Sequence, residues 1–403
     1  MPFWRKKYNF KLKKGSIKDK RALNTSRYNV LIFIDNLDSD MARNIIDITN
    51  GLIKRNVNVI ILASSIKFRR KLAANVEVMI LNVVVNKLMP FFMKIVYVQN
   101  ICNINKIDII LVTSAKCAYI ANQVAKNLHI KFVTYINELW DVKDKFSKKY
   151  NEIMLKSDLM LLPSLYICDY ILDNYDYVNH EKMKLVRGGI DINMFNIENV
   201  SDGRKMDAIK YLGENVVGKY IFLCLSKFVD NNGQMPLLRA IARLIERGAK
   251  NFICVLVDDF AGSNNYRHNL VNNIKKLGIE KYVLLSKTFD DVPALYSLSY
   301  VVLSLSNSVA LSARIIAEAG AMHRYTIIAH VRDINDYVIS DKSGYVVDPN
   351  NIANISNTME KILMQNREQY KTMCEHAHQC SLKYFDIRNT IIELDDALCA
   401  LVM

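Results

Sequence analysis

A short loop in the second half of the chain carries residues suited to binding an anion. The loop follows an apolar run that ends at Ser226, and it contains Lys227, Asn232 and Gly233. The sequence then predicts a helix that begins near Pro236. A lysine beside a helix N-terminus attracts negative charge, because the ammonium group and the first backbone N–H groups of the helix are both positive.

A second loop indicates the same chemistry. It follows an apolar run that ends at Leu305, and residues 309–313 lead into a helix that carries Arg314 and Glu318. A cation and two helix N-termini around one pocket can bind a diphosphate, and Glu318 would then accept hydrogen bonds from ribose hydroxyls. The alternative is a surface ion pair, since residues four apart on a helix are neighbours and such a pair is worth only about 0.2–0.5 kcal/mol. These residues alone leave both interpretations open.

Two other motifs have simpler explanations. Residues 213–220 approach the phosphate-binding P-loop pattern, but Tyr220 stands where that motif needs a Ser or Thr, and the segment precedes an apolar run instead of following one. Asp38 and Asp40 flank a serine and could chelate a cation. They lie at an expected helix start, however, where Ser and Asp are ordinary N-caps.

Residues 374–380 resemble a zinc tract. In a helix His376 and His378 point to different faces, so only Cys374 and His378 can cooperate, whereas a structural zinc site uses four ligands. No G-x-G-x-x-G follows any expected strand, which argues against a dinucleotide dehydrogenase. We therefore expect no metal site and no cofactor.

The elements that position these loops alternate along the chain in two series. Apolar runs predict strands, helical patterns lie between most of them, and this alternation is typical of α/β doubly wound domains with parallel sheets. Ligands of such sheets bind at the carboxyl ends of the strands, here facing a cleft between the domains. The expected strands are 28–35, 57–62, 76–81, 107–113, 131–134 and 158–162, then 220–226, 252–257, 282–285, 300–305 and 325–329.

The same patterns divide the chain into five parts. A basic tail precedes two Rossmann-like domains joined by a polar linker, and a helical segment that packs back toward the first domain follows them. The expected bounds are 1–26 for the tail, 27–190 and 216–355 for the domains, 191–215 for the linker and 356–403 for the C-terminal helices.

Composition limits the function. The chain has 403 residues, of which 51% are hydrophobic and 23% charged, a balance that excludes a wholly disordered protein. Its formal net charge of +14 predicts an anionic partner. The body shows no basic stripe with interleaved aromatics, so we expect no nucleic-acid binding. The eight scattered cysteines and the absence of an apolar leader or an uninterrupted apolar span favour a cytoplasmic protein.

A peripheral membrane contact is a further expectation. Residues 1–21 hold nine Lys or Arg against one acidic residue, with four aromatics nearby, and such a segment suits an anionic membrane surface. A solvated, frayed terminus explains the tail equally well. The apolar segment 83–98 is a second candidate contact, although we favour a place in the core.

Segments spread between Tyr28 and Phe385 resemble the GT-B-fold glycosyltransferases of family 4, especially bacterial cell-envelope members. The order and spacing of these segments carry the resemblance, since each one alone is unspecific. They are 132–135 (FVTY), 184–195 (KLVRGGIDINMF), 226–227 with 233–234 (SK and GQ), 237–240 (LLRA), 290–297 (DDVPALYS), 314–322 (RIIAEAGAM) and 344–349 (GYVVDP).

The resemblance implies a GT-B fold and transfer of a sugar from a nucleotide diphosphate-sugar to an acceptor, usually with retention and without a metal. It places Lys227 and Asn232 at the basic pair that stabilises the leaving diphosphate, and Asn137 at a first-domain histidine near the reacting centre. Glu318 falls at the second glutamate of an E-x7-E motif and Ala310 at the first. The implied donor-binding residues are Gly233, Ala310, Leu311, Ser312, Ala313, Arg314 and Glu318.

Several of these positions depart from the family pattern. Lys227 keeps a charge without the bidentate fork of arginine, Asn232 is neutral, and Ala310 lacks the carboxylate. Loss of one charge-stabilising donor typically costs about 100- to 1000-fold in rate. Either Arg314 or Arg187 supplies charge in an altered site, or the chain is a degenerate GT-B protein that binds a nucleotide-sugar or a partner without turnover. We expect a cytoplasmic, membrane-peripheral glycosyltransferase of lipopolysaccharide or related glycan synthesis.

Overall fold

The computed structural model describes most of the chain after the basic tail. The tail (1–26), Asn137 and most of the 36–40 loop lie outside the described residues, as does the side chain of Ala310, so the predictions made for them are not tested. The described ranges are 27–35, 40–65, 72–80, 89–136, 140, 142–258, 262–306, 309–331, 334 and 337–403.

The first domain is built on a parallel sheet with the strand order β3-β2-β1-β4-β5-β6-β7. Its strands are short, β-branched and largely buried, as expected for a parallel sheet covered by helices on both faces. The strands are β1 (Asn29–Ile34), β2 (Asn58–Ala63), β3 (Glu77–Ile80), β4 (Ile109–Val112), β5 (Lys131–Tyr135), β6 (Leu159–Leu162) and β7 (Met183–Leu185). The helices are α1 (Asp40–Lys54), α2 (Phe91–Ile104), α3 (Ala115–Leu128), α4 (Lys145–Asn151) and α5 (Leu165–Asn174).

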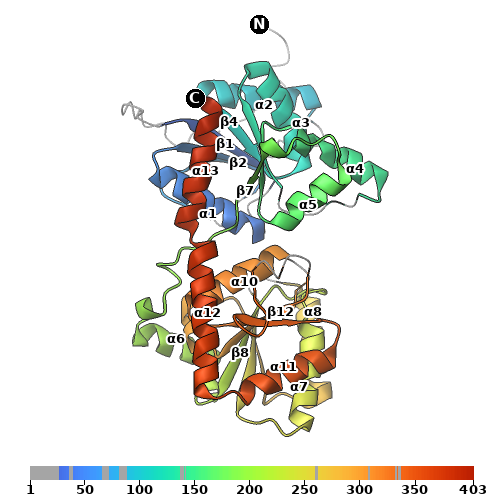
Figure 1. Cartoon of the computed structure of the whole chain (residues 1–403), viewed down its shortest axis with the longest axis vertical. Coiled ribbons are helices and arrows are strands. Elements are labelled where there is room, and N and C mark those ends of the chain that lie inside the picture. Colours follow the sequence, from blue (N-terminus) through green and yellow to red (C-terminus); the bar gives the residue numbers. More distant parts are fainter. Residues whose placement is uncertain are drawn as a thin grey trace.

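The second domain repeats the design, with the strand order β10-β9-β8-β11-β12-β13, again all parallel. The two domains are stacked along the long axis of the molecule (Figure 1). The strands are β8 (Tyr220–Leu225), β9 (Phe252–Val257), β10 (Val283–Ser286), β11 (Val301–Ser304), β12 (Thr326–Ala329) and β13 (Gly344–Val347). The helices are α6 (Asp202–Leu212), α7 (Gln234–Glu246), α8 (Asn264–Leu277), α9 (Val292–Leu298), α10 (Val309–Ala321) and α11 (Ile352–Leu363). The predicted fold class, two doubly wound Rossmann-like domains, is therefore confirmed.

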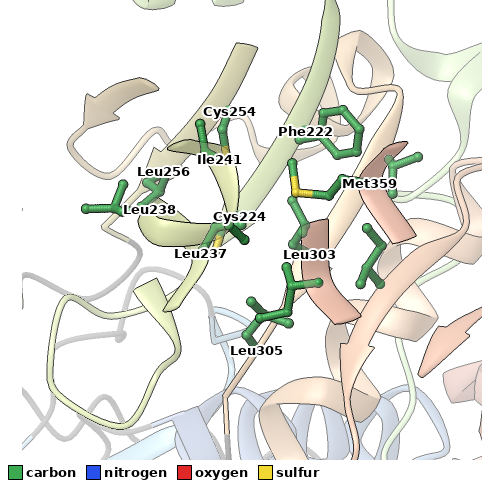
Figure 2. Close-up of a cluster of buried hydrophobic side chains, with 14 of the residues drawn as sticks. Phe222, Cys224, Leu237, Leu238, Ile241, Cys254, Leu256, Leu303, Leu305 and Met359 are labelled. Carbon is green, nitrogen blue, oxygen red and sulfur yellow. The ribbon is translucent and has the colours of Figure 1, made fainter. Parts of the chain in front are cut away.

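The core of the second domain holds α7 against the sheet. Leu237, Leu238 and Ile241 of α7 are fully buried in one cluster with Cys254 and Leu256 of β9 (Figure 2). The cluster ties α7 to the sheet directly after the loop that carries Lys227. This packing fixes where the N-terminus of α7 stands, at the carboxyl end of β8.

The segment 191–215, predicted as the linker, contains a helix. Helix α6 buries Ala208 and Leu212 in a core cluster of the second domain, and Arg204 makes a two-pronged ion pair of 2.7 and 2.6 Å with Asp291, the N-cap of α9. The polar composition of this segment hid the few apolar residues that attach it.

The C-terminal helices connect the two domains. Helix α12 (Arg367–Phe385) packs on α10 of the second domain, and α13 (Ile387–Val402) packs on α1 of the first, so the red helices run along both domains (Figure 1). The approach of α13 to α1 is close: a Cβ atom on Gly51 would lie 2.3 Å from the side chain of Ile391.

A buried carboxylate anchors α13 on the first domain. Asp395 has a fully buried side chain that accepts hydrogen bonds from Arg27 Nη1 at 2.6 Å, from Tyr28 Oη at 2.7 Å and from Arg55 Nε. Burial alone would raise the pKa of Asp395, but the hydrogen bonds from Arg55 and Tyr28 and the two guanidinium charges outweigh it and lower this pKa below 3.8. Asp395 is therefore held ionised, with its charge fully paired.

The Asp395 cluster predicts a large, local loss of stability. Asp395→Ala leaves Tyr28 and two arginines without their acceptor, and we expect it to lower the free energy of unfolding by about 3 kcal/mol, at the low end for a buried pair because both arginines are partly exposed. Urea unfolding monitored by circular dichroism measures this change. Asp396→Ala is the matched control, since that side chain is 65% exposed and lies 3.9 Å from Arg55; it should change stability by no more than about 1 kcal/mol. Equal losses in the two variants would contradict the anchoring role of Asp395.

Candidate functional site

The loop after β8 presents Lys227 to solvent at the carboxyl end of the central strand. Lys227 is exposed, whereas Asn232 is half-buried and holds the loop in shape. The Asn232 side chain donates from Nδ2 to the backbone oxygen of Lys227 at 2.8 Å and accepts from Ser306 Oγ at 2.8 Å. Asn232 therefore joins the loop after β8 to the loop after β11. These two strands are neighbours in the sheet, and the strand order reverses between them, so we call this place the reversal point.

Gly233 allows these two loops to touch. Its φ of +76° favours glycine, and a Cβ atom there would lie 2.5 Å from the backbone oxygen of Leu305. The next residue, Gln234, is buried and donates to Ser226 Oγ at 3.0 Å and to the oxygen of Lys227 at 2.9 Å. The backbone around Lys227 is thus held by side chains on both sides of the loop.

Helix α10 follows the second loop and packs its first turns inward. Leu311 and Ser312 are buried, with Ser312 Oγ 3.3 Å from Ser304 Oγ, and Ala313 is half-buried. The N-termini of α7 and α10 both follow strands at the reversal point of the sheet. The structure therefore brings the predicted loop residues and the start of α10 to one edge of the second domain.

Arg314 and Glu318 form an ion pair that is buried. Arg314 Nε donates to Glu318 Oε1 at 2.6 Å, with only 17% and 3% of the two side chains exposed. Tyr296 Oη donates to the other carboxylate oxygen at 2.9 Å. Arg314 Nη1 also lies 3.4 Å from Asp47 Oδ2 of α1, so the guanidinium links the two domains. The spacing i,i+4 indicated this pair, but the pair is not on the surface.

The charge of Arg314 is already balanced. Burial alone would lower its pKa, but Glu318 and Asp47 outweigh burial and raise the pKa above the ordinary value. Among the described contacts, the Arg314 guanidinium thus faces two carboxylates, those of Glu318 and Asp47. Arg187, the other candidate, is half-buried, with its guanidinium 5.6 Å from the ring centre of Tyr384. The described loop after β8 carries two exposed charges, the ammonium of Lys227 and the carboxylate of Asp230.

A pocket lies between the domains beside Arg314. Residues from the carboxyl ends of β5, β6 and β7 line it on the first-domain side, and α10 lines it on the other, together with the segment at Phe385. Of the predicted site residues, Ala313 and Arg314 line this pocket, whereas Lys227, Asn232, Gly233 and Glu318 do not. The lining residues are Asn44, Tyr135, Pro163, Ser164, Ile167, Gly188, Gly189, Ile190, Ala313, Arg314, Ala317, Tyr337 and Phe385.

Sequence reasoning missed the first-domain residues of this region. Asn44, Asp47 and Tyr135 stand in ordinary helix and strand patterns, and Asp47 is 267 residues from Arg314, so no local signal marks them. Tyr296 lay within a segment that carried the family resemblance, but its bond to Glu318 depends on the packing of α9 against the sheet.

The structure describes the P-loop-like segment and the zinc-like segment. The P-loop-like segment 213–220 runs up to the first residue of β8, and Gly213 caps the end of α6. In the zinc-like segment Cys374 is buried, while His378 Nδ1 lies 3.1 Å from the Gly320 oxygen and its ring stacks on His323. Among the residues that the structure describes, no group of three or more His, Cys, Asp or Glu could hold a metal ion.

The burial of the Arg314–Glu318 pair predicts unequal costs for its partners. Arg314→Ala leaves Glu318 buried and without its cation, so we expect the free energy of unfolding to fall by about 3–5 kcal/mol. Asp47→Asn removes a longer, partly exposed contact and should cost about 1 kcal/mol or less. Denaturant unfolding of both variants measures the difference. A surface pair would give a small, similar loss in each, and that result would overturn the buried arrangement.

Comparison with known proteins agrees with this architecture. Residues 212–379 match the sequence model of the family described as Glycosyl transferases group 1. No curated protein matches the sequence. The match covers the second domain, where the Lys227 loop and α10 lie.

Solved structures resemble nearly the whole chain. A glycosyltransferase from Rickettsia africae is 18% identical with a TM-score of 0.80, covering 93% of this chain and 99% of its own. Anabaena HepE in complex with UDP-glucose is 16% identical with a TM-score of 0.76, covering 92% and 99%. WaaG, a glycosyltransferase involved in lipopolysaccharide biosynthesis, is 14% identical with a TM-score of 0.69, covering 92% and 99%. The resemblance inferred from the sequence segments is thereby confirmed at the level of fold, while family 4 stays a prediction. The chain has the GT-B glycosyltransferase fold, and its second domain matches the group 1 glycosyl transferases.

Proposed function

We propose that the protein transfers a sugar from a nucleotide diphosphate-sugar to a cell-envelope acceptor, lipopolysaccharide or a related glycan, with retention and without a metal. The observation that carries the proposal is the exposed ammonium of Lys227 at the reversal point of the second sheet. Lys227 lies in the loop that leads from β8 into α7, and Asn232 bonds this loop to Ser306, which precedes α10. This region matches the glycosyl transferase family.

The electrostatics of this edge suit a leaving diphosphate. As the bond between the anomeric carbon and the diphosphate oxygen breaks, negative charge grows on that oxygen, and the acceptor oxygen bonds to the anomeric carbon. The acceptor proton then passes to the departing diphosphate. Each helix N-terminus carries about half a positive charge, and α7 and α10 have 13 residues each. Together with Lys227 they supply preorganised stabilisation of the leaving group.

The similar structures support the substrate class. HepE is described in complex with UDP-glucose, and WaaG acts in lipopolysaccharide biosynthesis. Those activities belong to those proteins, and they motivate the same class of donor and acceptor here.

A second candidate function is binding of a nucleotide-sugar without turnover. It is favoured by the engagement of three predicted site residues in structural bonds: Asn232 joins two loops, and Arg314 and Glu318 neutralise each other. The second glutamate of the motif, placed near the ribose by the resemblance, is buried and already accepts from two donors. Such a protein would bind the nucleotide-sugar without transferring the sugar.

Lys227 provides the test of the donor site. Because Lys227 is exposed, Lys227→Ala should leave folding intact while weakening UDP binding and lowering any transfer rate by about 100- to 1000-fold, and Lys227→Arg should retain part of the activity. Isothermal titration with UDP and transfer to a lipid extract measure the two effects. Lys250→Ala is the control. This exposed lysine precedes β9 and so lies at the amino ends of the strands, opposite the carboxyl ends where Lys227 lies.

Three outcomes are distinguishable. Transfer that depends on Lys227 supports the enzyme, and binding that depends on Lys227 without transfer supports the inactive binder. Unchanged binding and transfer in Lys227→Ala would refute the assigned donor site.

A peripheral membrane contact is part of the same proposal. In α2 the side chains of Phe91, Phe92 and Val96 are 53%, 65% and 51% exposed. We expected the segment 83–98 to lie in the core; Val98 is buried there, but these three side chains are not. An exposed aromatic patch, in a chain whose first 21 residues hold nine Lys or Arg, suits an anionic lipid surface. No described helix combines the length and apolar character that a membrane crossing demands.

Vesicle binding tests this contact. We expect the full chain to co-sediment with phosphatidylglycerol vesicles and much less with phosphatidylcholine vesicles. Replacing both Phe91 and Phe92 by serine removes two interfacial aromatics and should weaken the binding more than tenfold. Met364→Ser, at an exposed position of the second domain, should not change it. Equal binding of all forms to both lipids would exclude the proposed patch.

A further inference from the structure

The peptide group that joins Lys227 to Phe228 is held at both of its ends. Its carbonyl oxygen, that of Lys227, accepts from Asn232 Nδ2 at 2.8 Å and from Gln234 Nε2 at 2.9 Å. Its N–H, that of Phe228, donates to Asp258 Oδ1 at 3.2 Å. Because Asp258 directly follows β9, side chains from two separate segments fix the orientation of this one peptide plane.

Asp258 is a buried carboxylate that the proposed chemistry does not use. Its side chain belongs to a residue that is only 8% exposed, and the N–H of Gly262 donates to both of its oxygens at 2.9 Å. The described hydrogen bonds to this carboxylate all come from backbone N–H groups. Burial of a carboxylate is costly, but a hydrogen bond to an ionised acceptor is roughly twice as strong as one between neutral groups. Asp258 is therefore a strong, short link between the loops after β8 and β9.

The loop after β9 also packs directly on Phe228. A Cβ atom on Gly262 would lie 2.5 Å from the Phe228 oxygen and 2.6 Å from its nitrogen, so only glycine allows this approach. The N–H of Ser263 donates to the same oxygen at 3.0 Å, and the Phe228 side chain is fully buried. The exposed Lys227 thus stands next to a residue that is fixed on several sides. Since the lysine side chain is flexible, the protein can position its ammonium only through the backbone from which it extends.

We propose that Asp258 is a positioning residue of the donor site, whose carboxylate fixes the backbone from which the Lys227 ammonium reaches a diphosphate. The proposal rests on the glycosyltransferase function proposed above, and it adds the loop after β9 to the two loops already described. Asp258 acts through Lys227 and does not contact the ligand, because a carboxylate repels a diphosphate.

The sign of one affinity change tests this role. Asp258→Asn keeps the shape of the side chain but removes its charge, and the new amide NH2 group cannot accept from Gly262. Loss of a negative charge near a diphosphate strengthens the binding of UDP, whereas release of the Lys227–Phe228 peptide weakens it. We expect isothermal titration to show UDP binding about 3- to 10-fold weaker than in the wild type, as for the loss of one hydrogen bond. Unchanged or tighter binding would overturn the proposal.

Asp108→Asn is the matched control. Asp108 precedes β4 of the first domain, and its carboxylate accepts from the backbone N–H of Asn29 at 2.8 Å. This variant also removes a carboxylate that joins two backbone segments, so it should lower the melting temperature while leaving UDP binding unchanged. Equal weakening of UDP binding in both variants would assign the effect to lost stability and contradict the positioning role. All titrations are made at a temperature at which melting curves show each variant folded.

Gly262→Ala serves as a second variant that keeps the carboxylate. Its added methyl group pushes the loop after β9 away from Phe228, so we expect weaker UDP binding here too. UDP binding equal to that of the wild type in the folded Gly262→Ala protein would count against the role of this loop.

A double-mutant cycle with Lys227→Ala shows whether Asp258 acts through Lys227. In the Lys227→Ala background, Asp258→Asn should cause no further loss of UDP binding. An equal loss in both backgrounds would overturn the positioning role. If UDP binding depends on Lys227 but not on Asp258, the positioning role fails and the proposed donor site stands. If the wild type does not bind UDP, or binds it independently of Lys227, the donor site fails and the positioning role fails with it.

Discussion

The pocket between the domains depends on the contact between the two chain segments that connect the domains, at Ile190 and at residues 385–387. The backbone N–H of Ile190 donates to the oxygen of Phe385 at 2.8 Å, and that of Ile387 donates to the oxygen of Ile190 at 3.1 Å. Gly189 makes this contact possible, since a Cβ atom there would lie 2.6 Å from Ile387 Cα. Because both connections meet at one point, the strand ends of the first sheet are held opposite α10. Only in that arrangement can Arg314 reach Asp47, and the pocket between them exists for the same reason.

This arrangement divides the charges of the cleft into two groups. Near the contact between the connecting segments, Arg314 is enclosed by Glu318 and Asp47. At the reversal point of the second sheet, Lys227 is exposed with two helix N-termini and has no ion-pair partner among the residues that the structure describes. A sugar and a diphosphate place opposite demands on their surroundings, one needing hydroxyl partners and the other positive potential. The proposed function assigns the leaving diphosphate to the second of these groups, the exposed lysine with the neighbouring helix N-termini.

Most of the fold could be predicted from the sequence because its strands are buried, β-branched and regularly spaced. Most of the elements that escaped prediction lack a clear pattern. Strand β7 has three half-buried residues, and α2 is apolar around most of its circumference, so neither shows the expected periodicity. Helix α6 lies in a polar segment in which Ala208 and Leu212 alone among its own residues are buried. In each case tertiary contacts decided the structure.

The candidate site could be predicted only where local order determines it. Lys227 and Gly233 lie in the loop after β8, and Arg314 lies in the helix that follows β11, so their place near the carboxyl ends of the strands was accessible from the sequence. The spacing of Arg314 and Glu318 indicated that they could pair, but not whether the pair is exposed or buried. That difference matters physically, because an exposed pair is worth a few tenths of a kcal/mol and leaves the arginine available to a ligand. A buried pair commits the guanidinium to its own carboxylates, and the proposed donor site therefore relies on Lys227 of the neighbouring loop.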